Sequence, residues 1–232
     1  MYKFIKKFLK KNIHIRRLFY FIRDKFRIFY NQKRRSRFLW NLRKGDTVLS
    51  LDYPLNSDSV FFDVGAHIGD FSIQISKKFD CKIYAFEPLN ENYELLIQNV
   101  KNFPKIECFE VALSNFDGES EISNLGASAS LHMRSEGRLV KKINVKSFNS
   151  FMKEENIKHI DLIKMNIEGS EYELLNQIID SGHINNINHL QIQFHNFVHD
   201  SKNQRRKIRK KLQLTHINKF NFPFIWERWD LK

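Results

Sequence analysis

Two glycines and an acid are spaced in this chain as a nucleoside-binding site requires. The segment Val60–Ser72, VFFDVGAHIGDFS, is an apolar run that reaches Asp63, turns through a loop with Gly65 and Gly69, and opens into an amphipathic stretch. A second apolar run, KIYAFEP, ends near Glu87, which lies 18 residues after Gly69. An acid at the tip of a second strand can accept hydrogen bonds from ribose hydroxyls, and it lies roughly 20 residues past such a loop. The pattern therefore predicts a pocket for a nucleoside cofactor.

The loop between the glycines favours S-adenosylmethionine over a dinucleotide. Its sequence is Gly-Ala-His-Ile-Gly, whereas dinucleotide-binding folds use Gly-x-Gly-x-x-Gly, whose second glycine makes room for a pyrophosphate. S-adenosylmethionine has a ribose but no pyrophosphate, so the missing glycine is compatible with it. Inside the loop, His67 could touch the cofactor or hold the loop by a hydrogen bond. A buried strand followed by a plain glycine turn is the alternative interpretation.

Alternating strands and helices predict the elements that position these residues. Strands are expected at Val60–Val64, Lys82–Phe86, Ile106–Ala112, Leu162–Asn166 and His189–His195. Helices are expected at Asp70–Phe79, Glu91–Asn102 and Glu171–Ser181. This order predicts an α/β fold with a mainly parallel, doubly wound sheet that binds ligands at the carboxyl ends of its strands. Ser123–Arg138 could loop over the pocket as a substrate-facing segment or be a plain surface connection.

Three motifs occur in an order that resembles a known family. They are Asp-x-Gly-Ala-x-x-Gly from Asp63, a strand ending Phe-Glu-Pro, and Ile-Asp-Leu-Ile-Lys-x-x-x-Glu-Gly-x-Glu from Ile160. The chain resembles the FkbM-type S-adenosylmethionine-dependent methyltransferases from about residue 60 to residue 195, and more loosely to the Trp-Glu-x-Trp at 226–229. The resemblance implies a Rossmann-like methyltransferase domain. It also implies an O-methyltransferase that acts on a hydroxyl of a saccharide or glycolipid.

The resemblance assigns roles to individual residues. Four are implied to be cofactor residues: Asp63, Gly65, Gly69 and Glu87. Three more form a block at the fourth strand: Lys164, Glu168 and Gly169. Ala112, near the end of the third strand, is implied to lie near the adenine. Asn166, also expected at the cofactor, stands where the family more often has aspartate; its amide keeps the hydrogen-bonding reach but loses the charge and any ability to act as a base.

Methyl transfer to a hydroxyl needs an aligned acceptor oxygen and a group that helps to remove its proton. His195, in LQIQFHNF, is the first candidate base, because imidazole titrates near neutrality and strand ends face the ligand crevice. Glu168 is the second candidate, although a carboxylate at a helix start is also favoured by the helix dipole. Lys164 could steady an anionic acceptor or form an ion pair with Glu168.

Length and cysteine content limit the number of domains and the kinds of site that the chain can form. A chain of 232 residues is long enough for one α/β domain with a full core plus a short appendage. The two cysteines, Cys81 and Cys108, provide neither a disulfide framework nor a metal-ligand cluster. A reducing cytoplasm fits this composition, and no metal is predicted.

The positive charge is concentrated in the first 44 residues. Of 39 Lys and Arg, 16 lie there with one acid, Asp24, which leaves 23 basic and 25 acidic residues in the remainder. We therefore predict a basic arm over residues 1–44 and a methyltransferase domain over residues 45–232. Apolar residues recur in the arm at mostly helical spacing: Phe4, Phe8, Ile15, Phe19, Ile22, Phe26 and Phe29.

The arm is expected to be an amphipathic helix that lies on an anionic membrane surface. Its alternatives are a helix packed on the domain, an arm that binds a partner subunit, and an RNA-binding segment. No uncharged stretch reaches the roughly 20 residues that span a bilayer, and no long apolar signal segment occurs. These features predict a cytoplasmic protein, peripheral on the inner face of the membrane.

A second basic run, KNQRRKIRKK at residues 202–211, is expected to be a solvated helix face, or else to flank the acceptor site and attract an acidic glycan or phosphate.

The rival enzyme class is an RNA or DNA base methyltransferase. Families that act on exocyclic nitrogens usually carry Pro-Pro-Tyr or Pro-Pro-Phe after the fourth strand, where this chain has Asn166-Ile167-Glu168. A membrane-bound cofactor-binding module without catalysis is the third class; it depends on Asn166 and on Gln193, where the family pattern implies an acid.

Overall fold

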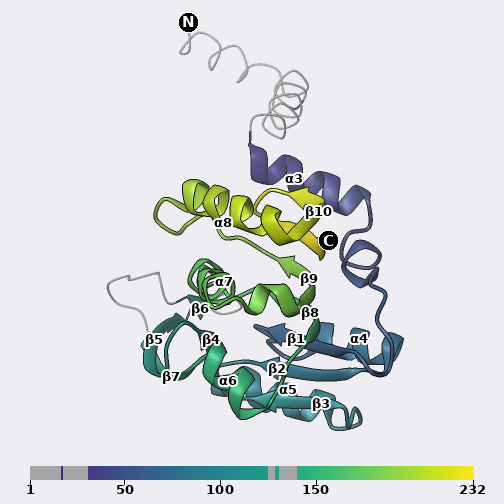
Figure 1. Ribbon diagram of the computed structural model, residues 1–232, viewed down its shortest axis with the longest axis vertical. Helices are drawn as coiled ribbons and strands as arrows, with labels where there is room; N and C mark the ends of the chain where they lie inside the picture. Colours follow the sequence, from purple (N-terminus) through teal and green to yellow (C-terminus); the bar gives the residue numbers. More distant parts are fainter. Residues whose placement is uncertain (1–16, 18–30, 125–128, 131–139) are drawn as a thin grey trace, which may run out of the picture.

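The computed structural model describes Arg17 and residues 31–124, 129–130 and 140–232. Its centre is a seven-stranded sheet of order β10-β11-β9-β8-β1-β2-β3 (Figure 1). The strands are β1 (Val60–Val64), β2 (Lys82–Phe86), β3 (Ile106–Phe109), β8 (Ile160–Met165), β9 (Ile187–Ile192), β10 (His216–Phe222) and β11 (Trp226–Leu231). Strands β1, β2, β3, β8 and β9 pair in parallel, and β11 pairs antiparallel with both β9 and β10. The predicted α/β fold with a mainly parallel sheet is confirmed.

Helices cover both faces of this sheet, because alternate side chains of each strand point to opposite faces. Phe61 and Ile83 pack in the core with α4 (Asp70–Phe79) and α5 (Asn90–Val100). Phe62 and Tyr84 pack in the core with α6 (Phe148–Glu154), α7 (Glu171–Asp180) and α8 (Ser201–Thr215). Two short 3-10 helices lie in connecting segments: η1 (Leu49–Leu51) precedes β1, and η2 (His183–Asn186) lies between α7 and β9.

A second, four-stranded sheet of order β4-β7-β5-β6 follows β3. Its strands are β4 (Ala112–Ser114), β5 (Gly118–Asn124), β6 (Ala129–Ser130) and β7 (Val140–Ser147). The predicted third strand, Ile106–Ala112, is therefore wrong at its end: β3 stops at Phe109, and Ala112 opens β4 in the other sheet. Of the predicted loop over Ser123–Arg138, residues 123–124 belong to β5 and 129–130 to β6, and the rest lies outside the described residues.

Two other strand boundaries differ from prediction. The fourth strand is β8, which starts at Ile160 and ends at Met165, one residue before Asn166. The fifth is β9, which ends at Ile192, so that His195 lies in the loop three residues beyond the strand. Apolar patterning does not mark these ends, because Phe194 stays buried after the pairing of β9 has stopped. Strands β1 and β2 and helix α4 have the predicted bounds.

Helix α3 (Gln32–Leu42) packs on the C-terminal hairpin of β10 and β11. Its N-terminus is capped by Asn31, whose side chain accepts a hydrogen bond from the backbone N of Arg34 at 3.1 Å. The fully buried Trp40 contacts the rings of Phe220 and Phe222, and its Nε1 donates to Asp46 Oδ1 at 2.8 Å. Residues 32–42 of the predicted arm thus form a helix packed on the domain. Of the rest of the arm, Arg17 and residues 31, 43 and 44 are described, and the other residues lie outside the described part of the chain.

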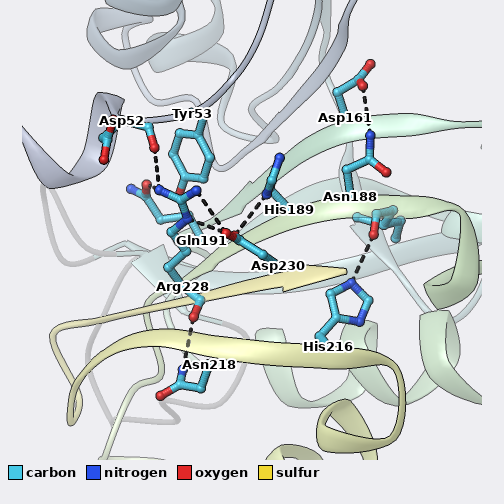
Figure 2. Close-up of polar contacts among 11 residues, drawn as sticks. Asp52, Tyr53, Asp161, Asn188, His189, Gln191, His216, Asn218, Arg228 and Asp230 are labelled. Atoms are coloured by element: carbon cyan, nitrogen blue, oxygen red, sulfur yellow. Dashed lines mark hydrogen bonds and ion pairs between the residues drawn. The ribbon is translucent and has the colours of Figure 1, made fainter. Parts of the chain in front are cut away.

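A buried polar cluster ties the segment before β1 to β9 and β11 (Figure 2). The hydroxyl of Tyr53 donates to Gln191 Oε1 at 2.8 Å, and burial raises the pKa of Tyr53, so that the phenol keeps its proton. The guanidinium of Arg228 lies over the Tyr53 ring and donates to Asp230, which also contacts His189 Nδ1 at 2.9 Å. Each of these side chains makes at least one hydrogen bond within the cluster, and together these bonds hold β9 and β11 against the chain segment that precedes β1.

None of the described helices is long and apolar enough to cross a membrane.

Candidate active site

A pocket of about 330 Å³ opens at the carboxyl ends of β1, β2 and β8. Residues 64–67, 86–89, 164 and 166–168 supply the rim after these strands, and residues 111–113 with Ile122 supply an apolar wall from the smaller sheet. This is the edge of a parallel sheet at which α/β folds bind ligands. The sequence analysis expected Ala112 near the adenine and the structure places it in this wall, but it expected a single sheet, whereas β4 and β5 belong to a second one.

Glu87 faces this pocket from the end of β2 and is held by three hydrogen bonds. Its Oε1 accepts from the backbone N of Leu89 at 3.1 Å and from Asn92 Nδ2 at 3.3 Å. Its Oε2 accepts from the backbone N of His67 at 3.0 Å. Burial raises the pKa of Glu87, and these hydrogen bonds oppose the rise. A carboxylate offers about four acceptor sites, so one is left for a ligand hydroxyl.

The glycines of the loop are required by close packing as well as by their backbone angles. Gly65 has φ +80°, and a Cβ there would lie 2.3 Å from the carbonyl oxygen of Asn166. Gly69 has φ +90°, and a Cβ there would lie 2.7 Å from Cδ1 of Leu96 in α5. Gly65 and His67 line the pocket, whereas Gly69 does not. His67 joins the loop to Glu87 through its backbone N, not through its imidazole ring.

Asp63 and Lys164 form a buried ion pair beneath the loop. Lys164 Nζ lies 2.7 Å from Asp63 Oδ1 and donates to the carbonyl oxygen of Gly65 at 2.9 Å. The other oxygen of Asp63 accepts from Ser72 Oγ of α4 at 2.7 Å. The predicted pairing of Lys164 with Glu168 is therefore wrong. Asp63 has no exposed surface and is not among the residues that line the pocket, so its carboxylate supports the loop and does not face the pocket.

Asn166 supplies an unsatisfied acceptor to the pocket. Its Oδ1 is buried and is the one such side-chain atom, among the described residues, that lacks a hydrogen-bond partner. A buried acceptor left unpaired costs roughly 1–3 kcal/mol, so a ligand that donates to it would recover this energy. Ala112, Leu113 and Ile122 form the apolar side of the same pocket. A nucleoside with a polar amino-acid chain fits this combination of an apolar wall and two acceptors.

His195 lies between two carboxylates. Its Nε2 is 3.2 Å from Glu168 Oε2, and its Nδ1 is 3.3 Å from Glu171 Oε1. Burial alone would lower the pKa of His195, but the hydrogen bonds that its ring donates to Glu168 and Glu171 outweigh burial and raise the pKa to about 9. The ring is therefore protonated at neutral pH. A protonated imidazole cannot accept a proton, so the two ion pairs favour a positioning role for His195, and its role as the base stays a prediction.

Glu168 is the member of this group that reaches the pocket. It lines the pocket, its side chain is 20% exposed, and its backbone adopts a left-handed conformation with φ 47°. His195 is not among the lining residues, so the imidazolium lies behind the Glu168 carboxylate. The arrangement presents a carboxylate oxygen to the pocket and a positive charge behind it.

The sequence analysis did not single out Glu171 or Tyr172, which hold His195. Glu171 is fully buried; its Oε1 accepts from the backbone N of His195 at 2.6 Å, and its Oε2 accepts from the backbone N of Gly169 at 2.8 Å. The hydroxyl of Tyr172 donates to the carbonyl oxygen of His195 at 2.7 Å. The Glu-Gly-x-Glu spacing is the signal for Glu171, since it places a second acid three residues after Glu168 at the start of α7.

Both cysteines are free, and the described part of the chain holds no group of three His, Cys, Asp or Glu arranged to bind a metal ion.

Comparison with known families and structures identifies related proteins. The family model described as "Methyltransferase FkbM domain" matches residues 63–224. A putative rRNA methylase from Clostridium thermocellum superposes with a TM-score of 0.51 at 8% identity, covering 82% of this chain and 94% of that chain. TrmK of M. capricolum, solved with S-adenosyl-homocysteine, gives a TM-score of 0.45 at 14% identity, covering 77% of this chain and 65% of that chain. A search of curated proteins finds no match. At these identities the solved structures show the fold alone.

Proposed function

Because the chain belongs to the FkbM family of methyltransferases, which its residues 63–224 match, we propose that it methylates a hydroxyl of a saccharide or glycolipid. The family makes the protein an S-adenosylmethionine-dependent methyltransferase with S-adenosylmethionine as its cofactor. The acceptor class and the roles of individual residues are the proposal.

The carboxylate of Glu168 is the observation that carries this proposal. S-adenosylmethionine supplies a methyl group on a sulfonium. The acceptor hydroxyl loses its proton as its oxygen bonds to the methyl carbon, and a positioned base accelerates this step. Glu168 lines the pocket and takes the proton in this proposal. His195, at 3.2 Å from Glu168 Oε2, positions the carboxylate.

Three features of the pocket would hold the cofactor. Glu87 has acceptor capacity left for ribose hydroxyls after its three hydrogen bonds. Asn166 Oδ1 would accept a hydrogen bond from a polar group of the cofactor. The apolar residues at 111–113 and Ile122 would exclude water from the base. Lys164 has a structural role in this account, since its charge is already paired with Asp63.

Two observations favour a hydroxyl acceptor over a nucleic-acid base. The motif that follows β8 resembles the FkbM pattern and reads Asn166-Ile167-Glu168 in place of the Pro-Pro-aromatic signature of exocyclic-nitrogen methyltransferases. A carboxylate base suits a hydroxyl, which must lose a proton as it is methylated. The likeness to rRNA methylases is one of fold.

The test is methyl transfer with the purified full-length chain. The protein is incubated with methyl-labelled S-adenosylmethionine and, separately, with lipid-linked glycans, nucleotide sugars and total RNA, and the labelled position is located by mass spectrometry. The proposal predicts a methyl ether on a sugar hydroxyl. Label found on an RNA base, with none on any glycan, would contradict it and favour the nucleic-acid enzyme.

A further inference from the structure

Helix α8 carries basic side chains that no acid neutralises. Its fifteen residues include seven Lys or Arg and no Asp or Glu. Arg205 and Arg209 pair with Glu227, and Lys211 pairs with Asp180. The other four have no ion pair or side-chain hydrogen bond within the described residues, and each is exposed: Lys202, Arg206, Lys207 and Lys210. The exposed face of α8 is therefore a dense, unpaired positive surface.

Helix α3 repeats this pattern. Its eleven residues, QKRRSRFLWNL, include four Lys or Arg and no acid, and none of these four forms an ion pair with a described residue. Trp40 and Ser36 face the domain, so the basic residues Arg34 and Arg35 and the apolar residue Phe38 are left on exposed surface.

Large apolar side chains lie exposed among these charges. Phe38 is 53% exposed and Leu42 69% exposed on α3, Leu214 is 78% exposed on α8, and Ile217 is 49% exposed on β10. Six of the ten large hydrophobic residues that are exposed in the described part of the chain lie on α3, the turn after it, α8 and β10. Such a concentration on three of the nineteen described elements and one turn is not the scattered exposure expected of an ordinary surface.

The two helices flank the same edge strand. Trp40 of α3 packs on Phe220 and Phe222, whereas Arg205 of α8 donates to Asn221 Oδ1 at 2.7 Å from the other side of β10. Alternate residues of a strand face opposite ways, so α3 and α8 sit on opposite faces of β10. Figure 1 shows both helices and β10 at one end of the molecule, remote from α5, α6 and β3.

We propose that this end of the molecule, formed by α3, β10 and α8 and termed the basic end, docks on an anionic lipid surface. Basic side chains attract the headgroups, while the exposed apolar side chains enter the boundary of the acyl chains. The apolar component favours lipid over RNA, because exposed aliphatic side chains such as Leu42 and Leu214 gain nothing from a phosphate backbone. Residues 1–30 add ten Lys and Arg to the chain directly before α3. The inference goes beyond the proposed function, since lipid binding is measured without any acceptor.

Vesicle co-sedimentation of the full-length chain tests the basic end. Vesicles of phosphatidylglycerol and phosphatidylcholine are compared with vesicles of phosphatidylcholine alone. The charge-reversal variant is Arg206→Glu, Lys207→Glu and Lys210→Glu. The matched control reverses three exposed lysines without side-chain partners elsewhere, Lys101→Glu, Lys153→Glu and Lys158→Glu, which lie after α5, on α6 and before β8. The melting temperature of each variant is measured to confirm folding.

We expect the α8 variant to lose at least about 100-fold in partitioning onto the anionic vesicles, because each basic residue near such a surface contributes about fivefold. The control should stay within about threefold of the wild type. Equal losses in both variants, or unchanged binding of the α8 variant, would overturn the proposal. RNA binding that depends on α8, without binding to vesicles, would overturn it in favour of nucleic acid.

A second variant tests the apolar component. Leu42→Ser with Leu214→Ser keeps every charge, so the variant should keep the electrostatic part of its binding at low salt and lose only the apolar part. At 0.5 M salt the charges are screened over a few ångströms, and the wild type should keep a residual binding that this variant has lost. If vesicle binding falls with salt concentration in the same way for the two proteins, no apolar side chain enters the bilayer, and the docking geometry is contradicted.

Discussion

The Nε2 atom of His195 lies 3.2 Å from Oε2 of Glu168, and this contact joins the loop after β9 to the pocket. The opposite ring nitrogen lies 3.3 Å from the fully buried Glu171. One imidazolium thus holds two carboxylates, of which only Glu168 lines the pocket. In the proposed mechanism this contact gives the two residues different roles: His195 positions the carboxylate, and Glu168 takes the proton of the acceptor.

Replacement of Glu168 by Gln should lower kcat while cofactor binding is kept. The amide retains the shape and the contact to His195 but cannot accept a proton, and a lost general base typically costs about 10²–10⁴-fold. The affinity for S-adenosylmethionine, measured by calorimetry, should change less than about threefold. Glu94→Gln, on the exposed face of α5, is the control and should match the wild type. A Glu168→Gln enzyme with full activity would remove Glu168 from the chemistry.

His195 should make the stability of the protein depend on pH in a defined direction. The pKa of His195 is raised from 6.5 to about 9 in the folded protein, so its stabilising contribution is complete below pH 6.5 and is lost as the pH rises through 9. The difference in unfolding free energy between the wild type and His195→Gln should therefore be larger at pH 6 than at pH 9.5, by on the order of 3 kcal/mol. Urea denaturation at the two pH values measures it. A difference that does not vary with pH would mean that the ring is neutral.

We expect the ion pair of Lys164 with Asp63 to stabilise the fold and not to act directly on the acceptor. Lys164→Met leaves the buried Asp63 carboxylate without its partner, and breaking a buried pair typically costs about 3–5 kcal/mol of unfolding free energy. The double variant Asp63→Leu with Lys164→Met removes both charges and should recover part of that loss. Chemical denaturation of the three proteins gives the comparison. If Lys164→Met is as stable as the wild type but inactive, Lys164 acts on the acceptor and the structural role is wrong.

Trp40 should anchor α3 to the hairpin. The side chain is fully buried against Phe220, Phe222 and Trp226, so Trp40→Ala should lower the unfolding free energy by about 3–5 kcal/mol. Phe38→Ala, on the exposed side of the same helix, should change it by less than about 0.5 kcal/mol. Thermal melts of both variants test the contrast. Equal effects would mean that α3 is not held as the structure describes.

The first βαβ unit could be predicted closely because every local signal agrees there. The apolar runs of β1 and β2 are bounded by glycine and proline, and α4 starts directly after Gly69, whose φ of +90° ends the loop. The carboxylate of Glu87 also reaches the pocket, as its place at the end of β2 indicated. Apolar patterning and turn residues are enough to predict the part of the site that is built from neighbouring segments of the chain.

The rest of the site depends on contacts between distant segments, which spacing does not reveal. The sequence indicated that strand ends face a crevice, but the loop after β9 turns so that His195 meets Glu168 and Glu171 from behind the pocket. Lys164 and Asp63 are paired by the register of β8 with β1, which aligns the two residues directly. The smaller sheet was missed because β4, β5 and β7 are short or mostly polar and bury only a few apolar side chains.

Calorimetric titration of S-adenosylmethionine into the wild type, Glu87→Ala and the control Glu94→Ala tests the central claim, that the pocket between β1 and β2 holds the cofactor. Loss of the Glu87 carboxylate removes an acceptor for the ribose and leaves the backbone N atoms of His67 and Leu89 unpaired. We predict that the wild type and Glu94→Ala bind alike, and that Glu87→Ala binds about 10- to 150-fold more weakly, since hydrogen bonds to a charged group contribute about 1.5–3 kcal/mol. Equal affinity of all three proteins, or no binding by the wild type, would contradict the account.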